Sequence, residues 1–120
     1  DRIFAYLNLS DSELATYEKL YQFLVSEVPQ PDLVVYLQAR VSSLVERIGS
    51  RGRDIERRIS KTYLDQVVQA HDHYFFRFEQ APLLVVDTNE INPLADRAQL
   101  DDLVSRIEAM ERGGIEYYRP

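Results

Sequence analysis

The chain has 120 residues, a net charge of −6 at pH 7 and no cysteine, and 45% of its residues are hydrophobic. These values allow one compact domain and exclude a disulfide framework or a thiolate metal site. The acidic balance argues against non-specific nucleic-acid binding, and no apolar run is long enough to cross a membrane. We therefore expect a globular, cytoplasmic protein with neither a nucleic-acid nor a membrane partner.

The first 28 residues predict two helices. The opening DRIFAYLNLS has no clear helix cap, so we interpret it as the middle of a helix, with one apolar face made by Ile3, Phe4 and Leu7. SDSE at 10–13 is a capping box, because a serine hydroxyl is followed three residues later by a carboxylate. An apolar stripe then recurs at helical spacing, at Leu14, Tyr17, Tyr21, Leu24 and Val28. It predicts an amphipathic helix over 10–28, packed in the core or against a second copy of the chain.

The most informative stretch is 31–60. LVVYL at 33–37 is apolar throughout, which predicts a strand covered on both faces, as in a parallel sheet. A helical segment follows, and we expect it to break at Gly49 and Gly52. Five arginines fall within twelve residues: Arg47, Arg51, Arg53, Arg57 and Arg58. Guanidinium groups present paired donors that match phosphate oxygens, so this segment predicts a phosphate-binding lid.

The second half predicts a helix from Ser60 to about Phe78, with His71 on its apolar face. His71 and His73 are two residues apart and do not face each other on a helix, so they cannot share an ion and we predict no metal site. The aromatic residues nearby are interpreted as core.

The remaining residues predict one more strand and one more helix. LLVV at 83–86 follows a proline and ends in DTNE. A last helix is predicted from Arg97 to Arg112, where Gly113 and Gly114 stop it. The tail IEYYRP gives no usable signal. Alternating strands and helices predict an α/β fold with a parallel sheet and right-handed crossovers. Because two strands do not make a viable parallel sheet, we expect further strands before residue 1.

Several segments resemble the C-terminal half of the deoxynucleoside kinases: PDLVVYLQA, ERI, RGRDIE, YLDQ and APLLVVDTNE. The nearest branch is the bacterial deoxyadenosine and deoxyguanosine kinases, whose central helices are similar to DRIFAYLNLSDSELATYEKLY. The resemblance extends to about Leu94. It implies a P-loop kinase fold, and transfer of the ATP γ-phosphoryl group, with Mg²⁺, to the 5′-hydroxyl of a deoxynucleoside in nucleotide salvage. A purine deoxynucleoside and a homodimer formed through the 10–28 helix are also implied.

The resemblance also gives roles to individual residues. Arg47, Arg51 and Arg53 match lid arginines that gather around the donor phosphates. Glu56 matches a lid carboxylate that accepts a hydrogen bond from the sugar 3′-hydroxyl, and Phe4 falls near a base-stacking phenylalanine. Four residues lie where the adenine of ATP rests: Asn89, Glu90, Ile91 and Asn92. Ile91 and Asn92 depart from the family's pattern in that loop, and Arg57 and Arg58 match no catalytic residue.

Neither a GxxxxGK[ST] loop nor a Glu-Arg-Ser-like segment occurs in the chain. We therefore expect residues 1–120 to form the C-terminal part of a single kinase domain, inactive on their own. Two alternatives stay open. One is a thymidylate kinase-like nucleoside monophosphate kinase, which shares PDLxxYL, ERI and an arginine lid. The other is a catalytically dead domain that dimerises through the 10–28 helix.

Overall fold

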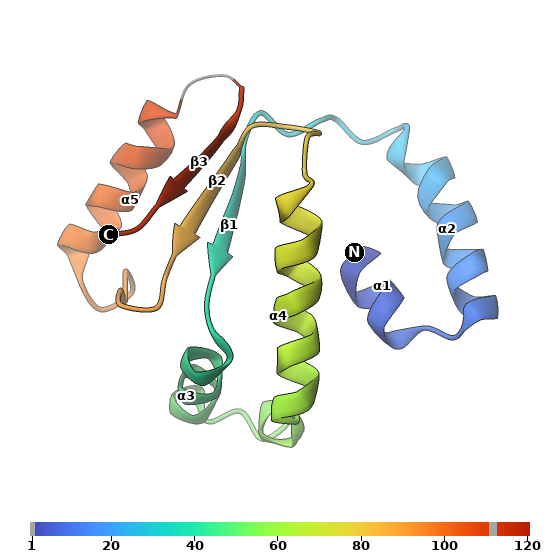
Figure 1. Cartoon of the computed structure of the whole chain (residues 1–120), viewed down its shortest axis with the longest axis horizontal. Helices are drawn as coiled ribbons and strands as arrows, with labels where there is room; N and C mark the ends of the chain where they lie inside the picture. Colours follow the sequence, from blue (N-terminus) through green and yellow to red (C-terminus); the bar gives the residue numbers. More distant parts are fainter. Residues whose placement is uncertain (1, 111–112) are drawn as a thin grey trace.

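The computed structural model describes residues 2–110 and 113–120, and a parallel sheet of three strands lies at its centre (Figure 1). The strands are β1 (Val34–Gln38), β2 (Leu83–Asp87) and β3 (Ile115–Tyr118), in the order β1-β2-β3. All pairs are parallel, so the carboxyl ends of the strands share one edge of the sheet. The predicted α/β fold with a parallel sheet is confirmed.

The prediction of only two strands is wrong, because the tail IEYYRP contains β3. Gly113 and Gly114 have φ values of +108° and +86°, which glycine adopts without steric cost. The backbone N–H of Leu83 donates to the carbonyl of Gly114 at 3.1 Å, and parallel pairing with β2 follows from there. The strand escapes sequence analysis because it is four residues long and three of its side chains are exposed.

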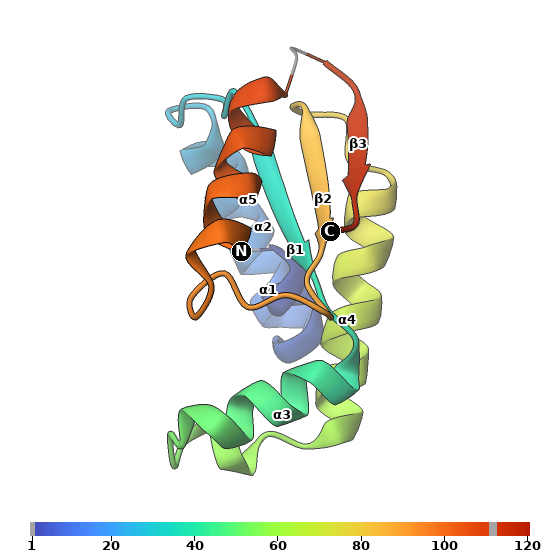
Figure 2. The ribbon, with the colours of Figure 1, turned by 90° about the vertical axis from the view of Figure 1, so that its left-hand side faces the viewer.

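Helices cover both faces of the sheet. Their bounds are α1 (Arg2–Asn8), α2 (Asp11–Val25), α3 (Val41–Arg51), the 3₁₀ helix η1 (Glu56–Arg58), α4 (Lys61–Phe76) and α5 (Arg97–Ala109). In Figure 2, α5 and α4 lie on opposite sides of the strands. Side chains of a strand point alternately to the two faces, and β2 follows this rule. Leu84 and Val86 pack on the α5 side with Leu103, whereas Leu83 and Val85 pack with Phe78.

The starts of α2 and α4 agree with the sequence, whereas α2 ends at Val25 and not at the predicted residue 28. The capping box of Ser10 and Glu13 is present, and Ser60 caps α4 by accepting from the N–H of Tyr63. The predicted break at Gly49 is wrong, because α3 runs through it to Arg51, where Gly52, with a φ of +67°, caps the helix. The helix α5 ends at Ala109, and the predicted end at Arg112 lies outside the described residues.

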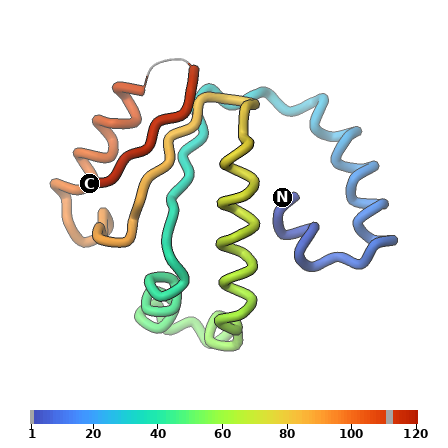
Figure 3. The backbone as a smooth tube through the Cα atoms, viewed as in Figure 1, coloured from blue at the N-terminus to red at the C-terminus, as the bar shows by residue number. Residues whose placement is uncertain are grey.

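The helices α1 and α2 lie beyond α4, away from β2 and β3 (Figure 3). The side chain of Arg2 on α1 contacts Glu18 and the ring of Tyr21 on α2. The predicted apolar stripe over 10–28 is only partly buried. Leu14, Tyr17 and Tyr21 are half-buried, whereas Leu24 and Val28 are exposed. No residue of α2 is fully buried. None of the described helices is long and apolar enough to span a membrane.

Candidate functional site

The arginine lid, residues 47–56, begins on α3 and turns at Gly52. This turn brings Arg51 and Arg53 to the same carboxylate. Arg51 Nη1 lies 3.0 Å from Glu56 Oε1, and Arg53 Nη1 lies 3.4 Å from the same oxygen. The two arginine side chains are 57% and 65% exposed, whereas that of Glu56 is only 18% exposed. The lid therefore presents two guanidinium groups to solvent around a largely buried counter-ion.

The second oxygen of Glu56 is different from the first. Oε2 is buried and has no hydrogen-bond partner among the described residues. A buried acceptor without a donor costs about 1–3 kcal/mol. One small hydroxyl or amide donor would satisfy this oxygen, so the lid combines an anion-binding surface with an acceptor for a polar ligand.

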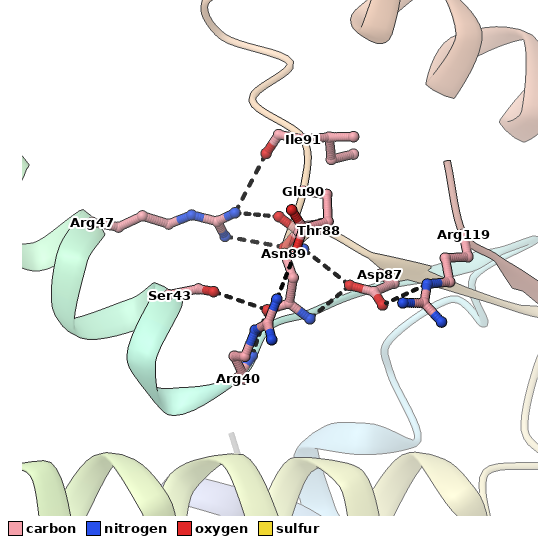
Figure 4. Close-up of polar contacts among 9 residues, drawn as sticks. All are labelled: Arg40, Ser43, Arg47, Asp87, Thr88, Asn89, Glu90, Ile91 and Arg119. Atoms are coloured by element: carbon pink, nitrogen blue, oxygen red, sulfur yellow. Dashed lines mark hydrogen bonds and ion pairs between the residues drawn. The ribbon is translucent and has the colours of Figure 1, made fainter.

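Arg47 does not join the other lid arginines. Its guanidinium donates to Thr88 Oγ1 at 3.0 Å, to the carbonyl of Thr88, and to the carbonyl of Ile91 at 3.4 Å (Figure 4). Thr88 is the buried polar residue of the described chain, and its hydroxyl donates to the carbonyl of Gln38. Arg47 thus ties α3 to the loop that follows β2.

The loop after β2, residues 88–92, is the second part of the candidate site. Asn89 Oδ1 accepts from the backbone N–H of Arg40 at 2.9 Å and from Ser43 Oγ at 3.0 Å. Asp87 Oδ1 in turn accepts from the backbone and side-chain nitrogens of Asn89 at 3.0 and 2.7 Å. The backbone hydrogen bond from Asn89, together with its side chain and Arg119, holds the pKa of Asp87 below its usual value. The loop is thereby fixed to the start of α3.

The four residues predicted to contact adenine divide into two kinds. The side chains of Asn89 and Ile91 are engaged internally, since Ile91 is buried in the core cluster on the α5 side. Glu90 and Asn92 are exposed, and Glu90 pairs with Arg40 at 2.6 Å. Of these four side chains, those of Glu90 and Asn92 are exposed, that of Asn89 is half-buried and that of Ile91 is buried.

Phe4 lies on α1, close to α4 rather than to the lid. Its ring meets His71 edge-on at 5.6 Å, and the His71 ring stacks on Tyr36 at 6.2 Å. His71 Nδ1 lies 2.8 Å from the carbonyl of Val67, which agrees with its interpretation as a packed histidine. Within residues 2–110 and 113–120, no three His, Cys, Asp or Glu side chains are grouped so that they could hold a metal ion.

The residues that support the loop were not predicted from the sequence. Arg40 and Ser43 carry no recognisable motif, and their role depends on the parallel pairing that sets the start of α3 beside the end of β2. Thr88 could have been noticed, because DTNE puts a hydroxyl directly after an apolar strand. In α/β sheets, ligands bind outside the carboxyl ends of the strands, and the lid and loop both follow those ends.

An α/β domain with an arginine lid and a fixed loop at the carboxyl edge of a parallel sheet is typical of phosphate-handling proteins. Residues 1–111 match the family model "Deoxynucleoside kinase", and the chain belongs to this family.

Two curated relatives show how far the similarity extends. The chain is 26% identical over 112 residues to deoxyguanosine kinase of Bacillus subtilis (strain 168), covering 90% of this chain and 54% of that protein. It is 35% identical over 66 residues to deoxyadenosine kinase of Dictyostelium discoideum, covering 55% and 27%. The structure of deoxyadenosine kinase from M. mycoides with bound dCTP superposes with a TM-score of 0.69 at 23% identity, covering 90% of this chain and 56% of that one. This last likeness shows the fold. The chain spans about half the length of the Bacillus relative.

Proposed function

We propose that this chain is the C-terminal part of a kinase domain that transfers the γ-phosphoryl group of ATP to the 5′-hydroxyl of a deoxynucleoside. The observation that carries the proposal is the geometry of Glu56. One of its oxygens accepts from Arg51 and Arg53, and the other is buried without a donor. A phosphate donor and a sugar hydroxyl are the two ligands that this arrangement would satisfy together.

Arg51 and Arg53 would bind the phosphate groups of ATP. Phosphoryl transfer leaves little covalent work to the protein, and negative charge spreads over the oxygens of the moving group. Guanidinium groups already directed at one place stabilise this charge without reorganisation. Both side chains are more than half exposed, and each guanidinium has further N–H donors that can reach a phosphate oxygen while one nitrogen stays paired with Glu56.

Glu56 would recognise the sugar. Its Oε2 would accept a hydrogen bond from the 3′-hydroxyl, which removes the cost of a buried unpaired acceptor. Because Arg51 and Arg53 both hold the other oxygen, binding of the sugar and binding of the phosphates would be coupled through one side chain.

The loop after β2 would support the adenine of ATP. Glu90, Asn92 and the loop backbone are the groups available for this contact, since Asn89 and Ile91 are held internally. Arg47 would hold this loop, because its guanidinium contacts Thr88 and Ile91, and a role at the donor phosphates would require the guanidinium to leave these contacts. Phe4 would stack on the nucleoside base from α1, because its side chain is exposed beside the edge-on contact with His71.

The remaining features of the proposal concern the whole protein. Purine deoxynucleosides are favoured by the names of the relatives, deoxyguanosine kinase and deoxyadenosine kinase. A homodimer through residues 10–28 is supported by the exposed apolar side chains of this segment: Leu20, Phe23, Leu24, Val25 and Val28. We further propose a cytoplasmic role in nucleotide salvage. Mg²⁺ would accompany ATP, but the described residues offer it no ligand cluster, so we assign no step to it.

A side-by-side phosphorylation assay tests the proposal. The full-length kinase would be given labelled ATP with deoxyguanosine, deoxyadenosine, deoxycytidine or dTMP, and the products separated. Label in a deoxynucleoside 5′-monophosphate is expected. Label only in dTDP would favour a thymidylate kinase-like enzyme, and no transfer to any acceptor would favour a catalytically dead domain.

A further inference from the structure

Strand β3 lies beyond residues 1–111, the part of the chain that the family model matches. It pairs along β2, which leads directly into the loop at 88–92. Tyr118, the last residue of β3, packs with Ile91 of that loop, and Arg119, which follows it, pairs with Asp87 just before the loop. The strand therefore has contacts that the similarity to the family does not explain.

Tyr118 contacts the loop from the α5 side of the sheet. Its ring is half-buried and packs against the cluster on the α5 side, which contains Ile91 of the loop together with Leu103. The guanidinium carbon of Arg106 lies 4.9 Å from the centre of the Tyr118 ring, which holds the ring between α5 and the sheet. The neighbouring Tyr117 points to the other face and is 70% exposed.

Arg119 acts on the loop through a carboxylate. Arg119 Nε lies 3.7 Å from Asp87 Oδ2, while Asp87 Oδ1 accepts both hydrogen bonds from Asn89 (Figure 4). Arg119 thus pairs with one oxygen of the carboxylate while the other oxygen holds Asn89, so the two contacts together restrain the orientation of the Asp87 side chain. From the opposite side, Arg40, Ser43 and Arg47 hold the same loop.

We propose that β3 positions the loop at 88–92, with Tyr118 and Arg119 as positioning residues for the donor nucleotide. This inference depends on the proposed role of that loop in binding the adenine of ATP. Neither side chain needs to touch the nucleotide. Tyr118 packs against the core cluster that contains Ile91, and Arg119 holds the carboxylate of Asp87 that accepts from Asn89. The lid residues that would contact the nucleoside are not involved.

Steady-state kinetics of the full-length kinase test the part played by Arg119. Arg119→Gln is expected to raise the KM for ATP about two- to fivefold, the range for loss of an exposed ion pair. The KM for the deoxynucleoside and the kcat should stay within experimental error. Arg119→Lys should restore the KM, and the difference should fade in about 1 M salt, which screens exposed charges. The matched control is Arg97→Gln, because Arg97 is also 83% exposed and pairs with Asp101 on α5. Equal KM changes in Arg119→Gln and Arg97→Gln would overturn the proposal for Arg119.

Hydrogen exchange followed by mass spectrometry tests Tyr118 without relying on catalysis. Tyr118→Ala should speed exchange of amides in residues 87–92 by about tenfold or more, while Tyr117→Ala leaves them unchanged. Should Tyr118→Ala fail to fold, Tyr118→Leu keeps apolar contact, and Arg119→Gln should still speed exchange at Asn89. Unchanged exchange at 87–92 in the Arg119→Gln and Tyr118 variants would overturn the inference. If the wild type phosphorylates no nucleoside, the proposed function fails, but this exchange experiment still decides whether β3 positions the loop.

Discussion

Arg51 Nη1 donates to Glu56 Oε1 at 3.0 Å, so the lid of this deoxynucleoside kinase family member carries its own counter-ion. Arg53 reaches the same oxygen from the other side of Gly52. The two guanidinium groups are therefore directed at one place before any phosphate is present. A phosphate that bound there, as we propose, would meet donors already directed at one place, so part of the orientation that phosphoryl transfer requires would be built into the lid.

Arg53→Lys in the full-length kinase should lower kcat on the order of ten- to a thousandfold, the range for removal of one transition-state donor. A lysine keeps the charge but loses the paired donors that suit phosphate oxygens. The KM for the deoxynucleoside should change much less. Arg58→Lys is the control, since Arg58 lies nearby on η1 and has no proposed role. A kcat of Arg53→Lys within about twofold of wild type would remove Arg53 from the mechanism.

The contact between Arg47 and Thr88 should stabilise the fold as well as the site. Arg47→Lys and Thr88→Val should each lower the free energy of unfolding, and a double-mutant cycle should give a coupling of about 0.5–1.5 kcal/mol. The cycle cancels the separate hydrogen bond from Thr88 to Gln38. Urea unfolding of the four proteins measures the coupling, and a value of zero within error would show that Arg47 contributes nothing through Thr88.

We expect the protein to lose stability at alkaline pH when the half-buried phenol of Tyr36 ionises. Burial raises the pKa of its phenol above the ordinary value, and the hydrogen bond that its hydroxyl donates to Asp72 at 2.7 Å raises it further. Because this pKa is raised, Tyr36 makes its full contribution to the free energy of unfolding below the unfolded pKa of about 10. That contribution is lost as the pH rises from there toward the folded pKa. Tyr36→Phe should therefore cost about 1–2 kcal/mol at neutral pH and weaken the alkaline loss of stability. Urea unfolding at pH about 7 and about 11, with exposed Tyr117→Phe as control, measures this; equal alkaline losses in wild type and Tyr36→Phe would contradict it.

The arginine lid and the parallel strands were predictable because their signals are local. A run of apolar residues specifies a covered strand, and arginines clustered around Gly52 specify a basic turn. The division of labour among the arginines was not predictable. Arg47 is four residues from Arg51 on α3, yet it contacts Thr88, and only the pairing of β1 with β2 determines this.

The missed strand has a related explanation. β3 is an edge strand with one half-buried side chain, so its sequence carries almost no alternation. Its position depends on the exposed edge of β2, which is distant in sequence. The sequence likewise does not predict that Glu56 Oε2 is a buried acceptor without a donor. The burial of this single oxygen depends on how η1, which begins at Glu56, is placed in the folded chain.

Residues 1–120 alone should bind ATP only weakly. Arg51 and Arg53 are exposed and paired with Glu56, and the chain has no glycine-rich phosphate loop for the lid to close onto. Screening by salt reduces what attraction remains. Calorimetry with ATP and Mg²⁺ in physiological salt should show no saturable binding in the micromolar range. Micromolar affinity would show that the phosphate site lies entirely within this chain.

The central claim is that Glu56 joins the sugar to the phosphate-binding arginines, and substrate discrimination by Glu56→Gln tests it most directly. The measurement is the ratio of kcat/KM for a deoxynucleoside to that for its 3′-deoxy analogue, in wild type and variant. The wild type should discriminate by about 1–3 kcal/mol, because the analogue leaves Oε2 buried and unpaired. The uncharged amide should narrow this ratio about fivefold or more, whereas Asp54→Asn, on an exposed carboxylate of the same lid, should leave it unchanged. An unchanged ratio in Glu56→Gln would mean that Glu56 only braces the lid arginines and does not recognise the sugar.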